Sequence, residues 1–297
     1  MDVIRPVSIT DAMLISSNVP ETDQSEWAAG TTYGEGNLVM CTASGDHHIY
    51  ESLQNANVGH NPKESPTWWL DLGATNRWKM FDSVVSTQTS NSASIEITLQ
   101  PGGINSLGLI EIEGSSVTAE LFDGATVVYS RTENLQISNA YSFYTHIFEP
   151  FAYKKHLIFT DIPTYATGQL HITITGINGG VAKCGVIAVG QSRYLGILQA
   201  KPTVGITDYS TKTTDAFGNL TLVKRAYSKR MSCVLWVAND IMDEVVRILY
   251  NLRSEPLAWF GSELYEATTI FGYYKDFSVM IESIDYSTCN LEIEGLT

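Results

Sequence analysis

The residues best suited to hold a ligand are aromatic and lie close together near the start of the chain. They are Trp27, Tyr33, Tyr50, Trp68 and Trp69, in an otherwise polar segment. Flat aromatic rings stack on the apolar faces of sugar rings, so Tyr33, Trp68, Trp27 and Tyr50 are candidate carbohydrate-binding residues. The competing interpretation is that these rings form the core of a unit too small to bury much else. Trp68 and Trp69 point to opposite faces if extended, so one ring can be buried while the other is exposed.

The densest group of metal-ligand residue types is Asp46-His47-His48, with Cys41 and His60 nearby in the sequence. Adjacent residues of an extended segment point to opposite faces, so His47 and His48 cannot chelate one ion together. A metal ion needs three or four converging ligands. We therefore expect no metal site and no cofactor.

Enzyme signatures are absent from the sequence. It contains no Gly-x-Ser-x-Gly elbow, no phosphate loop ending in Gly-Lys-Ser/Thr and no His-Glu-x-x-His motif. The pairs Glu111/Glu113 and Glu292/Glu294 each share a strand face and could serve a glycosidase. Solvated faces that keep strands from associating are the simpler interpretation, so we expect no catalytic residue. Residues 176–180 are rich in glycine between two predicted strands, which predicts a hairpin turn.

Composition limits the classes of function. The chain has 297 residues, with 18 Lys and Arg against 32 Asp and Glu, so its formal net charge is −14. A chain this acidic is repelled by phosphate backbones, which argues against sequence-specific nucleic-acid binding. The aromatic content of 10 % and the charged content of only 17 % exclude disorder and suit strands and turns. No run of about 18 apolar residues is present, so we expect no transmembrane segment.

The cysteines and the first residues bear on the compartment. The start of the chain has no basic region followed by an apolar core, so no signal peptide is expected. Cys41, Cys184, Cys233 and Cys289 are far apart and form no Cys-x-x-Cys pair. We expect four reduced thiols, mostly in strands, in a protein made in a reducing cytosol.

Short strands dominate the predicted elements. Alternating apolar residues predict strands at residues 37–40, 48–51, 95–99 and 117–121, and Asp123-Gly124 predicts a hairpin back to residues 126–129. Further strands are expected at residues 143–148, 156–159, 170–175, 185–189, 220–223, 233–238, 257–260, 277–281 and 290–293. Strands spaced every 8–12 residues, without amphipathic helices between them, predict a β-sandwich over residues 76–190.

One helix is expected near the C-terminus, between an N-cap at Asn239 or Asp240 and a stop at Pro256. Its buried face is the series Ile241, Val245, Leu249 and Leu252. The predicted fold class is therefore mainly β with one helix, in four parts. Residues 1–24 are an N-terminal arm, an extended segment or edge strand that docks on something else. Residues 25–75 are a small β module, 76–190 a β-sandwich and 191–297 an α+β domain.

Two sets of residues carry family resemblances. The first set is Trp27, Tyr33, Gly36, Val39, Tyr50-Glu51-Ser52, Asn57, Gly59, Pro62 and Trp69. In this order they resemble the small chitin-binding modules of bacterial chitinases, which implies a compact β module that grips polysaccharide with exposed aromatic rings. The sequence departs from that pattern in residues 52–66, where the exposed stacking pair belongs and no aromatic residue occurs. Residues 76–190 in turn look like the jelly-roll sandwiches called galactose-binding-like.

The second set is Tyr50-Glu51-Ser52, Asn57-Val58-Gly59, Trp68-Trp69, residues 73–82, Gly190-Gln191-Ser192 and residues 205–210, 215–218 and 291–296. With these motifs the chain is similar to tail-tip and baseplate proteins of tailed bacteriophages and prophages, in which a chitin-binding-like module precedes a β-sandwich. The resemblance implies a structural, non-enzymatic subunit of the virion, made in the host cytoplasm. Its expected partners are other tail proteins and further copies of itself in a ring or trimer, together with a host-surface glycan.

Two other functions compete with the structural one. A lectin-like receptor-binding protein would use the aromatic module, with or without the sandwich, to bind glycans. A glycan hydrolase would use the same module as an anchor, but no residue pair in the sequence stands out as its acid and base.

Overall fold

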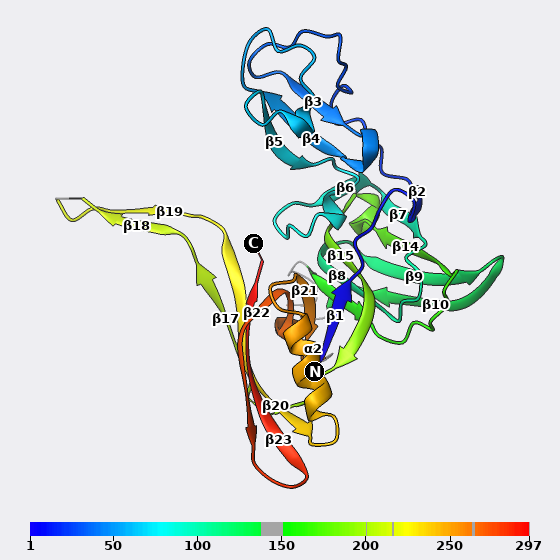
Figure 1. Ribbon diagram of the computed structural model, residues 1–297, viewed down its shortest axis with the longest axis vertical. Helices are drawn as coiled ribbons and strands as arrows, with labels where there is room; N and C mark the ends of the chain where they lie inside the picture. Colours follow the sequence, from blue (N-terminus) through cyan, green and yellow to red (C-terminus); the bar gives the residue numbers. More distant parts are fainter. Residues whose placement is uncertain (138–150, 200, 216, 263–264, 297) are drawn as a thin grey trace.

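The computed structural model describes residues 1–137, 151–199, 201–215, 217–262 and 265–296 (Figure 1). Strands hold 53 % of the chain and helical segments 9 %, which confirms the expected mainly β class. The strand expected at residues 143–148 lies outside the described residues. Within the described residues, no helix has the length and apolar character needed to cross a bilayer.

The β-sandwich is built on a five-stranded antiparallel sheet. In spatial order its strands are β10 (Thr126–Asn134), β9 (Ser116–Asp123), β14 (Gln169–Thr175), β7 (Ser94–Leu99) and β2 (Leu14–Ser17). The alternating residues Ile95, Ile97 and Leu99 are buried, as their spacing predicts. They pack in one cluster with Leu107 and Leu109 of the facing sheet, so the sandwich core lies between the two sheets.

The facing sheet has eleven strands and extends through the C-terminal half of the chain. Its main path runs β13 (His156–Phe159), β8 (Ser106–Glu113), β15 (Val181–Tyr194), β1 (Asp2–Pro6), β21 (Leu257–Phe260), β22 (Thr269–Ile281), β23 (Tyr286–Gly295), β20 (Tyr227–Ala238) and β16 (Ile197–Leu198). Beside this path, β6 (Thr89–Ser92) pairs with β15 and β17 (Thr203–Asp208) pairs with β20. Two short strands, β11 (Gln136–Ile137) and β12 (Ala152–Tyr153), form a separate pair.

The first residues of the chain match the expected arm or edge strand only in part: β2 is an edge strand of the five-stranded sheet, whereas β1 lies inside the eleven-stranded sheet. Strand β1 lies between β15 and β21, with Ile4 opposite Ser192 on one side and Ala258 on the other. Val3 and Ile4 are fully buried. Strand β15 runs through the expected boundary at residue 190, so β1 and β15 connect the sandwich to the C-terminal half through one continuous sheet.

The glycine-rich segment at residues 176–180 is not a hairpin. It joins β14 of the five-stranded sheet to β15 of the eleven-stranded sheet, through the 3₁₀ turn η4 (Ile177–Gly179). A Cβ atom at Gly176 would collide with the backbone oxygen of Gly180, so this crossing between layers requires glycine. The prediction failed because hairpins and inter-sheet corners use the same turn residues.

The expected helix is present as α2 (Met242–Asn251), and among the described residues it is the only α-helix. Val245, Leu249 and Leu252 are buried in one cluster with Leu235 of β20, which confirms the predicted face. The N-cap is Ile241, without a side-chain cap. Asn239 instead donates from its side chain to the carbonyls of Ser283 and Ile284, so a tertiary contact uses the group expected to cap the helix.

The small module at residues 25–75 has its own three-stranded sheet, in the order β3 (Leu38–Cys41), β4 (His48–Ser52) and β5 (Trp69–Ala74). Strands β3 and β4 match the strands expected at residues 37–40 and 48–51, and they pair antiparallel. The remaining 3₁₀ turns are η1 (Ala43–Gly45), η2 (Pro62–Glu64), η3 (Lys79–Phe81) and η5 (Glu266–Thr268).

All four cysteines have free thiols and lie in strands β3, β15, β20 and β23, as expected.

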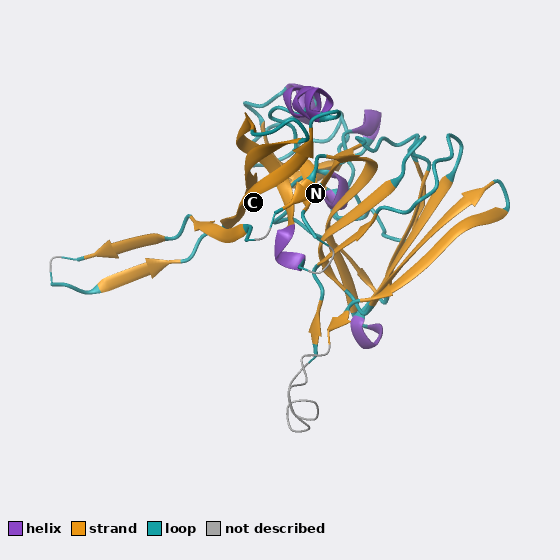
Figure 2. Ribbon diagram, turned by 90° about the horizontal axis from the view of Figure 1, so that it is seen from below, coloured by secondary structure: helices purple, strands orange, loops and turns teal. Residues whose placement is uncertain are grey.

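A long two-stranded ribbon projects from the body in both views (Figures 1 and 2). It begins where β17 pairs with β20 and continues into β18 (Thr211–Thr214) and β19 (Leu220–Val223). We call residues 209–226 the arm. Every residue of β19 is exposed, although three of its four side chains are apolar.

Candidate functional site

The aromatic residues singled out by the sequence form the core of the small module. Tyr33 is only 9 % exposed and Tyr50 only 5 %, and both pack with buried Trp69. The rings of Tyr33 and Trp69 meet edge to face, with centroids 5.2 Å apart. Burial and a hydrogen bond to Asp46 raise the pKa of Tyr50 above its usual range. Tyr33 and Tyr50 are therefore core residues and present no open ring face to a sugar.

Trp27 and Trp68 are half-buried against the same core. The ring of His60 stacks on Trp68 with centroids 4.0 Å apart, so one of its faces is already covered. The indole nitrogen of Trp27 is buried and has no hydrogen-bond partner among the described residues. The structure thus brings all four candidates together, with Tyr33 and Tyr50 in the core and Trp27 and Trp68 as half-buried rings packed against it.

His47 and His48 have separate partners. His47 lies between Glu21 and Asp11, at 2.8 and 2.5 Å, and stacks on Trp78. His48 contacts the carboxylate of Asp71 at 2.8 Å. His47 therefore ties the module to the preceding segment of the chain. No group of three potential metal ligands converges within the part of the chain that the structure describes.

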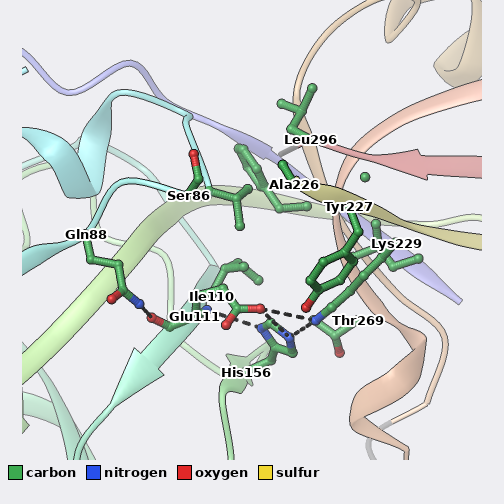
Figure 3. A pocket seen from close by; sticks show the side chains of 14 residues that line it. Ser86, Gln88, Ile110, Glu111, His156, Ala226, Tyr227, Lys229, Thr269 and Leu296 are labelled. Carbon is green, nitrogen blue, oxygen red and sulfur yellow. Dashed lines mark hydrogen bonds and ion pairs between the residues drawn. The ribbon is translucent and has the colours of Figure 1, made fainter. Parts of the chain in front are cut away.

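A cavity of about 260 Å³ opens where the sandwich meets the C-terminal half (Figure 3). Strands β8 and β13 of the sandwich lie on one side, and β20, β22 and the end of β23 lie on the other. Much of the lining is apolar, as at Val85, Ile110 and Phe271. Its polar groups include Gln88, Glu111, His156, Tyr227 and Lys229.

Glu111 has an unusual backbone, with φ of 50° inside strand β8. Non-glycine residues rarely adopt this conformation, and where they do it marks a constrained position. Gly185 of β15 lies beside it, and a Cβ there would approach the Ile110 oxygen to 3.0 Å. The carboxylate is 19 % exposed and contacts Lys229 at 3.4 Å and Lys155 at 3.7 Å. Glu111 is thus not on the solvated strand face expected for it, whereas Glu292 is exposed.

His156 is a buried polar residue in the wall of this cavity, only 7 % exposed. The ammonium group of Lys229 contacts its Nε2, and the amide of Glu111 donates to Nδ1 at 3.3 Å. Glu266 accepts hydrogen bonds from the amides of Lys155 and His156. Burial, with the charges of Lys229 and Lys155, lowers the pKa of His156 to about 3, so the ring is neutral near pH 7.

These contacts connect the two halves of the molecule. Glu111 and His156 belong to sandwich strands, while Lys229 belongs to β20 of the C-terminal half. Removing the ammonium would leave a partly buried carboxylate with Lys155 at 3.7 Å and the neutral ring of His156 at 3.6 Å. Sequence reasoning missed this group because its members are 45 to 118 positions apart and match no motif.

The neutral His156 predicts an acid-sensitive fold. Below its usual pKa of 6.5 the unfolded chain binds a proton that the folded chain excludes until about pH 3. The free energy of unfolding therefore decreases as the pH falls from 6.5 towards 3, by up to about 1.4 kcal/mol per pH unit. Urea unfolding of the wild type and of His156→Gln from pH 7 to 4 measures this, and the variant should show the shallower slope. If the free energy of unfolding of the two proteins fell with the same slope as the pH is lowered, the low pKa of His156 would be contradicted.

Comparisons with known proteins do not assign the chain to a family. No family model, no curated protein sequence and no solved structure matches the chain. The functional argument therefore rests on the residues and their arrangement.

Proposed function

We propose that the chain is a structural subunit of a multiprotein assembly, the tail tip or baseplate of a tailed bacteriophage. In this role it binds other tail proteins and further copies of itself, and the assembled surface approaches the host envelope. The sequence motifs support the assignment to a phage tail, and the exposed arm supports a role as a subunit of an assembly. The aromatic module then serves as a folded spacer or interaction unit, since Tyr33, Tyr50 and Trp69 form its core.

The single observation that carries this proposal is the arm. Isolated two-stranded ribbons are marginally stable in water, and exposed apolar residues on them favour association. Leu220 and Leu222 are 59 % and 64 % exposed, and Val223 lies beside them. Such a ribbon is suited to an assembly in which a neighbour covers it.

The arm is nevertheless well formed as a ribbon. Asp215 accepts hydrogen bonds from the amides of Phe217 and Asn219 at its turn, and Tyr209 continues the pairing from β17. The side chain of Asn219 also donates to Asp215 at 2.8 Å, and together with the backbone amides it lowers the pKa of the Asp215 carboxyl. An extended element that holds its shape before contact loses less conformational entropy on binding, which favours a role in assembly.

Particle association tests the proposal. Virions or induced prophage particles from the strain that encodes the chain are purified on a density gradient, and peptides of the chain are sought by mass spectrometry. The chain should sediment with tails, and antibodies against it should label one tail end. A variant in which Asn-Gly replaces residues 209–226 keeps the pairing of Asp208 with Tyr227 and should be excluded from particles. The proposal fails if the wild-type chain stays in the soluble fraction.

A further inference from the structure

One face of the arm combines two leucines with a positive charge. In the pairing of β18 with β19, Lys212 lies opposite Leu222 and Thr214 lies opposite Leu220. Residues opposite each other, and residues two apart on one strand, share a face of a ribbon. Lys212, Leu220 and Leu222 therefore form one exposed surface, which we call the arm face. Thr213 points to the other side.

The small module has an exposed surface of matching chemistry. Leu38, Glu51 and Leu70 lie in one row across β3, β4 and β5, and Leu72 follows Leu70 on the same side. The three leucines are between 39 % and 50 % exposed. We call these four residues the module face. It is the side of the sheet opposite the buried core residues Val39 and Tyr50.

Charge distinguishes the two elements. Residues 209–226 contain three basic residues and one acidic residue, within a chain of net charge −14. Residues 25–75 contain six acidic residues and one basic residue. Each face thus places leucines around one charge, and the two charges, Lys212 and Glu51, have opposite sign. Two such surfaces attract each other and can bury their leucines by packing sheet on sheet.

We propose that the arm face of one copy packs on the module face of a second copy, with Lys212 meeting Glu51. Within one copy the arm extends away from the module, so the contact joins different copies (Figure 1). The two faces differ, so the contact is head-to-tail, and repeating it produces a closed ring or an open chain. This inference rests on the proposed function, for which it names the self-association surface.

Charge reversal tests this pairing. Lys212→Glu and Glu51→Lys each place like charges together and should weaken self-association about tenfold. The double variant restores opposite charges and should recover association to within about threefold of the wild type. Sedimentation velocity over a range of concentrations measures the oligomers. Lys275→Glu, at an exposed lysine of β22, is the control with the same charge change and should associate as the wild type does.

Disulfide trapping gives a second readout that does not depend on affinity. Lys212→Cys protein mixed with Glu51→Cys protein should form a cross-linked heterodimer under mild oxidation, because the native cysteines are buried. Thr213→Cys, on the other side of the arm, should cross-link far less. Melting temperatures equal to that of the wild type establish that the variants fold.

The results of these experiments distinguish failure of the arm-to-module contact from failure of the proposed function. A wild-type chain that is monomeric at all concentrations overturns the inference, as does a double variant no better than the single ones. If the chain is still found in particles and the arm-deleted variant is not, the structural role stands. The arm then binds a different tail protein.

Discussion

Ile4→Pro is expected to lower the free energy of unfolding by about 3 kcal/mol or more. Ile4 lies in β1 between β15 and β21, so its backbone is inside the sheet. Proline has no N–H group and removes one hydrogen bond from the strand ladder. The variant also loses a fully buried side chain that packs with Ile110 and Phe271. Equilibrium unfolding in urea measures the loss.

A conservative variant separates the backbone effect from the packing effect. Ile4→Val keeps the N–H group and removes one methylene, so it should cost about 0.5–1.5 kcal/mol. If β1 were a peripheral arm, both variants would unfold at the wild-type urea concentration. Equal stability of Ile4→Pro and Ile4→Val would therefore contradict the position of β1 in the sheet.

Leu249→Ala is expected to lower the free energy of unfolding by about 2–5 kcal/mol. Leu249 is fully buried in the cluster that joins α2 to the sheet, where it packs with Leu235 and Trp259. Its carbonyl also accepts a hydrogen bond from the hydroxyl of Tyr274, at 2.8 Å. Truncation leaves a cavity under the helix that a packed sheet cannot fill.

The matched control lies on the same helix. Arg247 is exposed, so Arg247→Ala places the same residue type in the same helix without removing a buried side chain. It should stay within about 0.5 kcal/mol of the wild type. Thermal and urea unfolding of the three proteins compare the two sites directly. A wild-type midpoint for Leu249→Ala would refute the placement of the helix on the sheet.

Local sequence patterns correctly predicted those elements whose own residues show a clear periodicity of apolar side chains. The alternation of Ile95, Ile97 and Leu99 predicted a strand with one buried face, and the Val245 and Leu249 spacing predicted the buried side of α2. Both signals depend only on the period of side chains along the backbone. The hairpin between β9 and β10 was likewise predictable, from its Asp123-Gly124 turn.

The members of the aromatic cluster were predictable from the sequence, but the burial of each ring was not. The sequence placed Tyr33, Tyr50 and Trp68 in one small unit, and the structure brings them together. Which rings are covered depends on neighbours such as His60, whose stacking on Trp68 no spacing rule predicts. The contact of Glu111 with Lys229 was equally invisible, because its partners come from distant strands.

The sequence by itself determined the mainly β class, the helix, the hairpin at Asp123-Gly124 and the free cysteines, because these follow from local periodicity, turn residues and composition. Tertiary structure alone decided that β1 joins the two halves and that Tyr33 is core. It also decided that Leu38, Glu51 and Leu70 share a face. The physical reason is that long-range packing determines which strands pair. The residues of a strand do not by themselves indicate its partners.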